Sequence, residues 1–511
     1  MMYNGCANYT KYRKLLALEP SPLSHTEGKI ALKAALFALG CKVNSYETER
    51  IREDMVSAGF EIVDFSEKAD VYIVNTCSVT NIADRKSRQM LHKAKTMNPS
   101  ALIVATGCYV QTAEKDEKLL EAADILIGNN HKSDIVKKIL ERLDQIHKVD
   151  ATGINGSDDI ADTKNAEDIE LSKRITAANG SSTYIQPLID DIACENSVED
   201  LSITDYPERS RAFVRIEDGC NQFCTYCIIP YARGRVRSRE KDEILEEIRS
   251  LADKGFKEVV ITGIHLSSFG IKNYENDLKK NEWNYKPLLD LIQETGKIKG
   301  IERIRLGSLE PRIICKEFID GLKSVESFCP HFHLSLQSGC DTVLKRMNRH
   351  YSAEEFLEKC ELLRSCFDRP AITTDVIVGF PQETDEEFAK TEKMLEKAAF
   401  SKMHIFKYSR RKGTVADRMP GQLTESVKHE RAVKLQELDN RMHKSYAESF
   451  IGQEVRVLIE EENDEYMEGL TERYLSVRIK KQDGSCENIN TFRTVKVLSV
   501  TDDGVLCPVS G

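Results

Sequence analysis

Long hydrophobic runs are missing from this chain of 511 residues. No uninterrupted apolar segment is long enough to span a bilayer. The first thirty residues contain only the short apolar patch LLAL, which is too little for the core of a signal peptide. These absences exclude membrane insertion and secretion as first expectations, so we expect a cytoplasmic protein with no membrane partner. The length also predicts more than one domain.

Positive charge is scarce as well, because the formal net charge is −10. Such a balance argues at first sight against a nucleic-acid partner. The excess acid is local, however: residues 148–206 carry 13 Asp and Glu against 4 Lys and Arg. Residues 209–239 carry seven arginines against two acids. A solvated basic surface is the ordinary explanation of that stretch, but its charge is compatible with a nucleic-acid partner.

Cysteine, by contrast, is abundant, with 15 in the chain. Disulfides are disfavoured in the cytoplasm, so cysteines there point to metal binding or catalysis. Many of the fifteen could be ordinary buried small residues. Two groups of three have spacings that call for a different explanation, and the expected domains place them.

Residues 29–147 alternate between short apolar runs and amphipathic stretches, which predicts a doubly wound parallel sheet. The expected strands are Ile30–Leu39, Val71–Asn75, Leu102–Ala105 and Asp124–Ile127, and the expected helices are Glu47–Ala58, Asp84–Thr96 and Ser133–Leu143. Residues 148–206 are rich in Asp, Asn, Ser, Thr and Gly without periodicity. We expect them to form a loosely ordered linker or insertion.

Residues 207–446 predict a second α/β domain with six strands. Their apolar runs begin at residues 211, 257, 301, 331, 371 and 402, and helices such as Glu240–Asp253 and Ala353–Arg364 separate them. Six such units indicate a partial (β/α)6 barrel with its active site at the C-terminal strand ends. One long charged helix is expected over residues 423–450. Residues 447–511 contain three strand-like runs with turns, which predicts a small all-β barrel.

The first cysteine group lies within eight residues, in EDGCNQFCTYCIIPYARGRVRSR, at Cys220, Cys224 and Cys227. One loop can wrap three such thiolates around a single metal centre. Zinc usually takes four protein ligands, and no fourth Cys or His lies close in sequence. A cubane iron–sulfur cluster with one open iron fits three ligands better, and S-adenosylmethionine (SAM) can fill the open position.

The second group is dispersed: Cys41 in ALGCKVNSYE, Cys77 in VNTCSVT and Cys108 in ATGCYVQ. Each follows the end of an expected strand, about one βα unit from the next. Carboxyl ends of parallel strands lie along one edge of a sheet, where ligands gather. Three thiols at three such ends can converge, so a second three-thiolate cluster is the economical hypothesis.

These motifs resemble a known family. The C-x3-C-x-aromatic-C pattern is similar to that of the radical SAM superfamily, and the GC-x-x-N-x-x-E, NTC and GC motifs together resemble those of radical SAM methylthiotransferases. The resemblance covers roughly residues 29–511 apart from the acidic stretch. It implies two [4Fe-4S] clusters and SAM, with one SAM methylating a sulfur and another cleaved to a radical that removes hydrogen from adenine C2.

The wording LGCKVNSYETE, NTCSVTNIADRKSRQ and HLSLQSGCDTVLKRMNRHY is most similar to enzymes acting on N6-threonylcarbamoyladenosine at tRNA position 37. Isopentenyladenosine enzymes usually carry GCQMN, and ribosomal-protein aspartate enzymes usually carry GCPKN. Both remain alternatives, as does a non-catalytic iron–sulfur protein for electron transfer. Cys340 and Gln382 depart from the family pattern, which has Ser and Gly there. The C-terminal module, which the resemblance implies is an RNA-binding domain, has 7 basic against 12 acidic residues over 451–511, so it cannot hold RNA by bulk charge.

The resemblance also implies roles for individual residues. Tyr226 should pack near the adenine of SAM, and further SAM contacts are expected at strand ends from Thr262, Gly263, Gln337 and Gly379. The alternating arginines Arg233, Arg235, Arg237 and Arg239 should share one side of an extended segment and hold phosphates of the tRNA anticodon loop. An electron donor such as flavodoxin or ferredoxin and a sulfur donor are the remaining expected partners.

Overall fold

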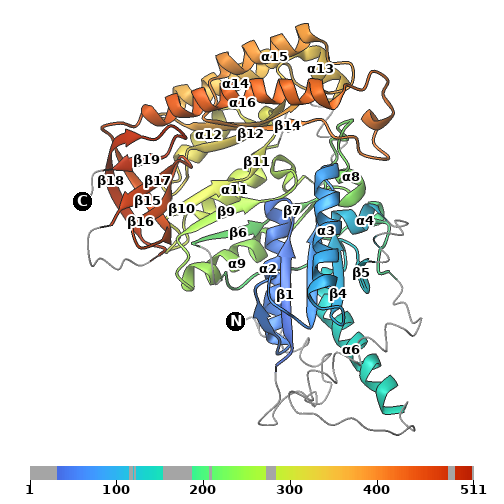
Figure 1. Cartoon of the computed structure of the whole chain (residues 1–511). Coiled ribbons are helices and arrows are strands. Elements are labelled where there is room, and N and C mark those ends of the chain that lie inside the picture. Colours follow the sequence, from blue (N-terminus) through green and yellow to red (C-terminus); the bar gives the residue numbers. More distant parts are fainter. Residues whose placement is uncertain are drawn as a thin grey trace.

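The computed structural model describes residues 31–113, 119, 122–152, 187–206, 210–271, 284–481 and 489–508. Within them the chain forms a parallel sheet with helices, an open barrel of parallel strands and a small closed barrel (Figure 1). The predicted fold class, α/β with a C-terminal all-β barrel, is confirmed. The N-terminal sheet packs against the central barrel, and the small barrel lies at the far side of that barrel.

The N-terminal sheet has five parallel strands in the order β2-β1-β3-β4-β5. They span β1 Lys33–Ala38, β2 Glu61–Val63, β3 Val71–Thr76, β4 Leu102–Gly107 and β5 Ile125–Ile127. Strands β3 and β4 are buried along their whole length, as their near-continuous apolar runs predict. The connecting helices are α2 Lys42–Ser57, α3 Asn81–Met97, α4 Cys108–Thr112 and α6 Ile135–Thr152. Separate apolar clusters on the two faces confirm the doubly wound arrangement.

The two ends of the acidic stretch that the structure describes, residues 148–152 and 187–206, are more ordered than a loose linker. Helix α6 continues to Thr152, and residues 153–186 lie outside the described residues. Residues 187–206 are described, and Leu201, Ile203 and Tyr206 are buried in the core of the central barrel. That part of the prediction was wrong, because composition does not show that three apolar side chains find a partner surface elsewhere in the chain.

The central barrel is built from parallel strands that follow one another in chain order. They are β6 Arg211–Arg215, β9 Glu258–Thr262, β10 Arg303–Leu306, β11 Ser308–Leu309, β12 His331–Gln337, β13 Ala371–Val378 and β14 Lys402–Lys407. Strands β10 and β11 are one strand interrupted at Gly307, so six strands result, as predicted. The helices are α9 Lys241–Asp253, α11 Lys286–Thr295, α12 Lys316–Lys323, α13 Asp341–Arg346, α14 Ala353–Cys366 and α15 Asp385–Ala398.

Local signals fix several of these helices. Ser352 and Glu355 form a capping box at the start of α14, and Thr384 and Glu387 form another at the start of α15. The side chains of α9, α11, α12, α14 and α15 share one apolar core with the outward faces of the strands. The core therefore lies between the strands and the helices. The side chains on the inward faces of the strands are not part of it.

Helix α16 spans Glu425–Glu448 and leads into the small closed barrel. That barrel has the strand order β15-β16-β17-β19-β18, with bounds β15 Glu454–Glu462, β16 Tyr466–Thr471, β17 Ser476–Lys480, β18 Phe492–Val500 and β19 Leu506–Pro508. The sequence predicted β15, β17 and β18. Its apolar interior includes Val457, Ile459, Val477, Val497 and Leu506.

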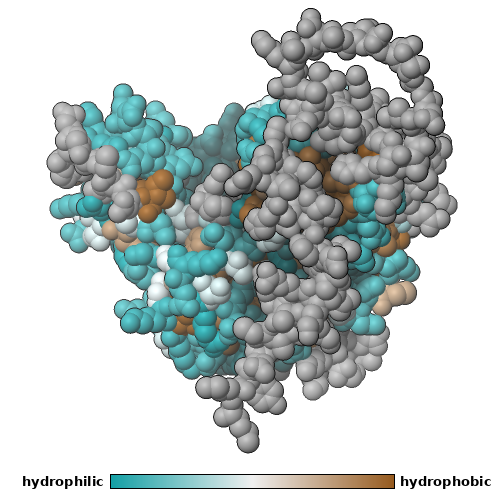
Figure 2. Space-filling model, turned by 90° about the horizontal axis from the view of Figure 1, so that it is seen from below, coloured by the Kyte–Doolittle hydropathy of each residue, from teal (hydrophilic) through white to brown (hydrophobic). Residues whose placement is uncertain are grey.

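No helix within the described residues is both long and apolar enough to cross a membrane. Seen from below in Figure 2, the face that the described residues present is mostly hydrophilic, with a few separate hydrophobic patches.

Candidate functional site

The first cysteine group lies at the carboxyl edge of the N-terminal sheet. Cys41 is the N-cap of α2 after β1, Cys77 follows β3, and Cys108 begins α4 after β4. These strands are neighbours, so the three thiols converge although 67 residues separate the outer two. The pKa of Cys77 is raised to about 12, mainly because the thiol is buried and further because the thiols of Cys108 and Cys41 lie near it. None of the three is in a disulfide.

Glycine before two of these cysteines is a steric requirement. Gly40 has φ +97°, and a Cβ there would lie 2.5 Å from the Cys77 Sγ. Gly107 has φ +100°, and a Cβ there would meet the Thr76 carbonyl oxygen. Both positions need the left-handed region and leave no room for a side chain. The two GC dipeptides are thus part of the geometry that lets the thiols approach one another.

The second group lies on the loop between β7 Glu217–Asp218 and α8 Ile229–Ala232, beyond the carboxyl end of β6. All three of its cysteines are half-buried. The pKa of Cys227 is raised to about 12, mainly because the thiol is buried and further because Cys224 lies near it. The guanidinium of Arg349 donates a hydrogen bond to the Cys224 Sγ at 3.3 Å.

Arg349 is itself held by a buried carboxylate. Its Nη2 donates to Glu310 Oε2 at 2.8 Å and to the Ser335 carbonyl at 3.2 Å. Burial opposes ionisation of Glu310, but Arg349 and His265 lower its pKa to about 2. The cation beside Cys224 is therefore fixed in position by a charged partner.

The two cysteine groups face each other. Cys108 of the first group is among the groups that raise the pKa of Cys227 in the second. Asn129 links the two loops, because its Nδ2 donates to the Ala232 carbonyl at 2.7 Å and lies 3.7 Å from the Cys108 Sγ. Helices α4 and α8 are in contact at the same place. Thiols from two different domains thus line one junction.

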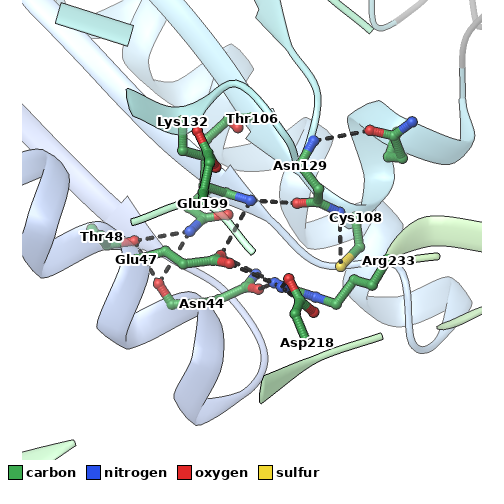
Figure 3. Close-up of polar contacts among 12 residues, drawn as sticks. Asn44, Glu47, Thr48, Thr106, Cys108, Asn129, Lys132, Glu199, Asp218 and Arg233 are labelled. Carbon is green, nitrogen blue, oxygen red and sulfur yellow. Dashed lines mark hydrogen bonds and ion pairs between the residues drawn. The ribbon is translucent and has the colours of Figure 1, made fainter. Parts of the chain in front are cut away.

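A buried charge network supports this junction (Figure 3). Glu47 of α2 accepts hydrogen bonds from Arg233 at 2.9 and 3.0 Å and forms ion pairs with Arg215 at 3.1 Å and Lys132 at 3.2 Å. Asp218 adds a second carboxylate, 3.1 Å from Arg233. Although burial opposes it, Arg233 holds the pKa of Glu47 far below its usual range. Arg237 lies 3.9 Å from Asp218 as well, so four cations face these two carboxylates.

The residues present fit iron–sulfur clusters with three protein ligands each. Burial raises the pKa of both Cys41 and Cys227, and Arg233 and Arg349, respectively, oppose that rise, so each thiol group has a fixed cation beside it. Asn129 donates to the Cys108 Sγ and Arg349 donates to the Cys224 Sγ, as groups around a metal site commonly do to the ligand sulfurs. A closed four-ligand zinc site fits less well, since each group offers three thiols.

The predicted phosphate-binding arginines require a correction. Arg233, Arg237 and Arg239 are buried, with Arg233 fully enclosed, and they pair with Glu47, Asp218 and Glu247. They cannot meet phosphates in this arrangement. The assumption of one extended segment was wrong, because Arg233 ends α8 with ψ 0°, Gly234 has φ +74°, and β8 comprises only Arg237–Ser238. Arg235 alone of the four is exposed, with its guanidinium 4.5 Å from the centre of the Phe223 ring.

The predicted SAM contacts all lie near the carboxyl ends of the barrel strands. Thr262 ends β9, Gly263 follows it against Glu217, Gln337 ends β12 with φ 71°, and Gly379 follows β13 with φ +73°. Tyr226 packs edge-on against Phe380 with 6.5 Å between ring centres. This is the edge from which the Cys220–Cys227 loop rises, and their contact with SAM stays a prediction.

Two important residues were present in the quoted motifs but received no role from the sequence. Glu47 is the last residue of GC-x-x-N-x-x-E. Cys41, Asn44 and Glu47 follow one another at intervals of three residues, which places all three near one face of a helix. That periodicity could have identified Glu47. Arg349 in MNRHY had no comparable signal, because its approach to Cys224 depends on the folding of the whole barrel.

Two family models match the chain. The radical SAM superfamily matches residues 214–395, and a family described as uncharacterized protein family UPF0004 matches residues 33–128. They cover the central barrel and the N-terminal sheet, respectively.

Curated relatives extend over almost the whole chain. It is 36% identical to threonylcarbamoyladenosine tRNA methylthiotransferase MtaB of Bacillus subtilis over 91% of this chain and 93% of the relative, and 37% identical to MtaB of Aquifex aeolicus over 88% and 96%. It is 32% identical to tRNA-2-methylthio-N(6)-dimethylallyladenosine synthase of Thermoanaerobacter sp. over 90% and 88%. A radical SAM domain implies SAM and a [4Fe-4S] cluster. The chain therefore belongs to the family of radical SAM tRNA methylthiotransferases.

Proposed function

We propose that this enzyme adds a methylthio group to C2 of N6-threonylcarbamoyladenosine at position 37 of tRNA. The observation that carries the proposal is the meeting of two three-cysteine groups at one junction. Adenine C2–H is not acidic, so a side-chain base has nothing to remove. Clusters and SAM would supply one-electron chemistry and a methylated sulfur, while the protein supplies position and electrostatics.

In this proposal Cys220, Cys224 and Cys227 hold the cluster that binds SAM, and Cys41, Cys77 and Cys108 hold a second [4Fe-4S] cluster. Tyr226, Thr262, Gly263, Gln337 and Gly379 contact SAM from the strand ends. Arg349 and Arg233 compensate the negative charge of the thiolates. An electron donor such as flavodoxin or ferredoxin and a sulfur donor complete the system.

The RNA contact near the site is reassigned to an exposed group beside the second cysteine loop. It consists of Arg235, Phe223 and Tyr231; the two rings are 6.3 Å apart and both are partly exposed. Exposed aromatic rings next to an arginine suit the unstacked bases and phosphates of an RNA loop.

The choice of threonylcarbamoyladenosine rests on sequence. LGCKVNSYETE has the wording of that subgroup, and the two relatives quoted at 36% and 37% identity carry that substrate in their names. Relatives named for dimethylallyladenosine reach 32%, so that substrate is the alternative to exclude.

The test is nucleoside analysis of tRNA from a strain lacking the gene and from the complemented strain. We expect loss of the 2-methylthio derivative of threonylcarbamoyladenosine and its return on complementation. Loss of 2-methylthio-isopentenyladenosine, or of a methylthio group on a ribosomal-protein aspartate, would contradict the proposal. Reconstituted protein that forms no 5′-deoxyadenosine from SAM would instead indicate a non-catalytic iron–sulfur protein.

A further inference from the structure

The inward face of the central barrel carries charged and polar side chains. On β10, Ile304 and Leu306 pack in the core beneath the helices, so the alternate residues Arg303 and Arg305 face the interior. By the same alternation Arg211 on β6 and His331 on β12 face inward. The interior therefore contains several cations, and the buried Glu258 of β9 is the counter-charge of Arg303 and Arg305.

Tyr474 of the C-terminal barrel joins this interior group. Its ring stacks on His331 with 5.0 Å between centres and 20° between planes. The guanidinium groups of Arg211 and Arg305 lie 5.4 and 4.8 Å from the centre of the same ring. Three barrel strands and a loop of the third domain thus meet at one place.

Lys42 reaches the same place from the N-terminal domain. It is the first residue of α2, directly after Cys41. Burial lowers the pKa of its ammonium, which also interacts electrostatically with Tyr474, Arg305, Arg211 and, beyond ion-pair distance, with the carboxylate of Glu258. Arg211 is paired with Glu460 at 2.5 Å and Arg305 with Glu258 at 2.9 Å. Among the described residues, no carboxylate lies within ion-pair distance of the Lys42 ammonium, although the cations around it each have one. An anion could occupy that position.

We propose that Lys42, beside the interior arginines, binds the carboxylate of the threonylcarbamoyl group and so selects this substrate over the uncharged isopentenyl one. The inference rests on the proposed function and adds a specificity residue to it. The observation behind it is that Lys42 directly follows Cys41, a ligand of the proposed second cluster, at the start of α2. Isopentenyladenosine enzymes usually carry glutamine at this position, in GCQMN, and glutamine has no charge to offer.

The test uses the full-length, cluster-reconstituted enzyme and anticodon stem-loop RNAs that carry one of three groups: threonylcarbamoyladenosine, its neutral methylamide, or isopentenyladenosine. For the wild type, the methylamide should reduce kcat/KM by roughly ten- to a hundredfold, as expected for loss of a charged hydrogen bond. Lys42→Met should reduce kcat/KM on the acid to a similar extent and leave the methylamide almost unaffected. Lys42→Arg should restore most of the activity on the acid.

Lys93→Met, at an exposed lysine of α3, is the matched control and should behave as the wild type. Iron content and formation of 5′-deoxyadenosine in Lys42→Met should also match the wild type. If the wild type methylthiolates the acid and the methylamide equally well, the inference is wrong and the proposed function stands. If Lys42→Met lowers both to the same extent, the inference is likewise wrong. A wild type active on isopentenyladenosine RNA but on neither other RNA would overturn the proposed function as well.

Discussion

Each cysteine group has its own arginine, and each arginine is fixed by a buried glutamate. Arg349 lies between Glu310 and Cys224, and Arg233 lies between Glu47 and the thiols of the first group. A guanidinium that donates to both oxygens of one carboxylate, or to several acceptors, is held in place when a neighbouring thiol is protonated or oxidised. The positive charge beside the thiols is therefore part of the folded architecture and does not need to be recruited by a ligand.

Glu217 predicts a pH dependence at the scale of one residue. It is fully buried on β7, its Oε1 accepts a hydrogen bond from the His265 backbone, and burial raises its pKa from 4.5 to about 8. The folded protein therefore holds a proton that the unfolded chain releases above pH 4.5. Its contribution to stability is fully present below that pH and declines as the pH rises to about 8, by at most about 1.4 kcal/mol per pH unit.

Thermal unfolding of the cluster-free protein between pH 5 and 9 checks this expectation. Glu217→Gln, which cannot lose a proton, should be most stabilised relative to the wild type at the alkaline end. A constant difference in melting temperature across this range would show that Glu217 is ionised in the folded protein.

At the scale of one element, the β1–α2 turn predicts a selective loss. Gly40→Ala would place a methyl group 2.5 Å from the Cys77 Sγ at a position with φ +97°. We expect the first cysteine group to lose its cluster and the second to keep it, so iron should fall from about eight to about four atoms per chain. Iron and sulfide analysis after reconstitution measures the number of iron atoms per chain.

Gly59→Ala is the matched control for that turn. Gly59 has nearly the same backbone angle, φ +92°, but no atom lies within 4 Å of the added Cβ. It should suffer the backbone strain alone, about 1 kcal/mol, and keep all its iron. Equal loss of iron in both variants would mean that strain, and not the approach to Cys77, disrupts the site.

The elements were largely predictable, and so was the convergence of the first cysteine group. Apolar runs alternating with amphipathic helices define a parallel sheet, and a parallel sheet places Cys41, Cys77 and Cys108 along one edge. The arginines after Cys227 were not predictable in the same way. Their even spacing suggested one face of a strand, but their partners Glu47 and Glu247 are distant in sequence, and tertiary ion pairs determined their placement.

At the scale of the whole molecule, the burial of Arg233 and the exposure of Arg235 predict how the N-terminal sheet is joined to the barrel. Arg233 connects the N-terminal sheet to the barrel through Glu47, whereas Arg235 is exposed two residues away. Arg233→Met should destabilise the protein by about 3–5 kcal/mol, because it leaves buried carboxylates without their partner. Arg235→Met should leave the melting temperature unchanged.

The exposed Arg235 should matter for tRNA binding although it does not matter for stability. Arg235→Met should weaken binding and reduce the salt dependence by about one phosphate contact. Filter binding at several salt concentrations, with thermal unfolding alongside, measures both effects. Unchanged tRNA binding by Arg235→Met would remove this residue from the RNA contact.

The central claim is that two cysteine groups from two domains hold two separate clusters at one junction. Iron analysis with Mössbauer spectroscopy on three proteins tests it most directly: the wild type, the variant with Cys41, Cys77 and Cys108 changed to alanine, and the variant with Cys220, Cys224 and Cys227 changed to alanine. The account predicts about eight iron atoms per chain in the wild type and about four, in one [4Fe-4S] cluster, in each variant. A wild type with about four, or a first variant that keeps all eight, would contradict it.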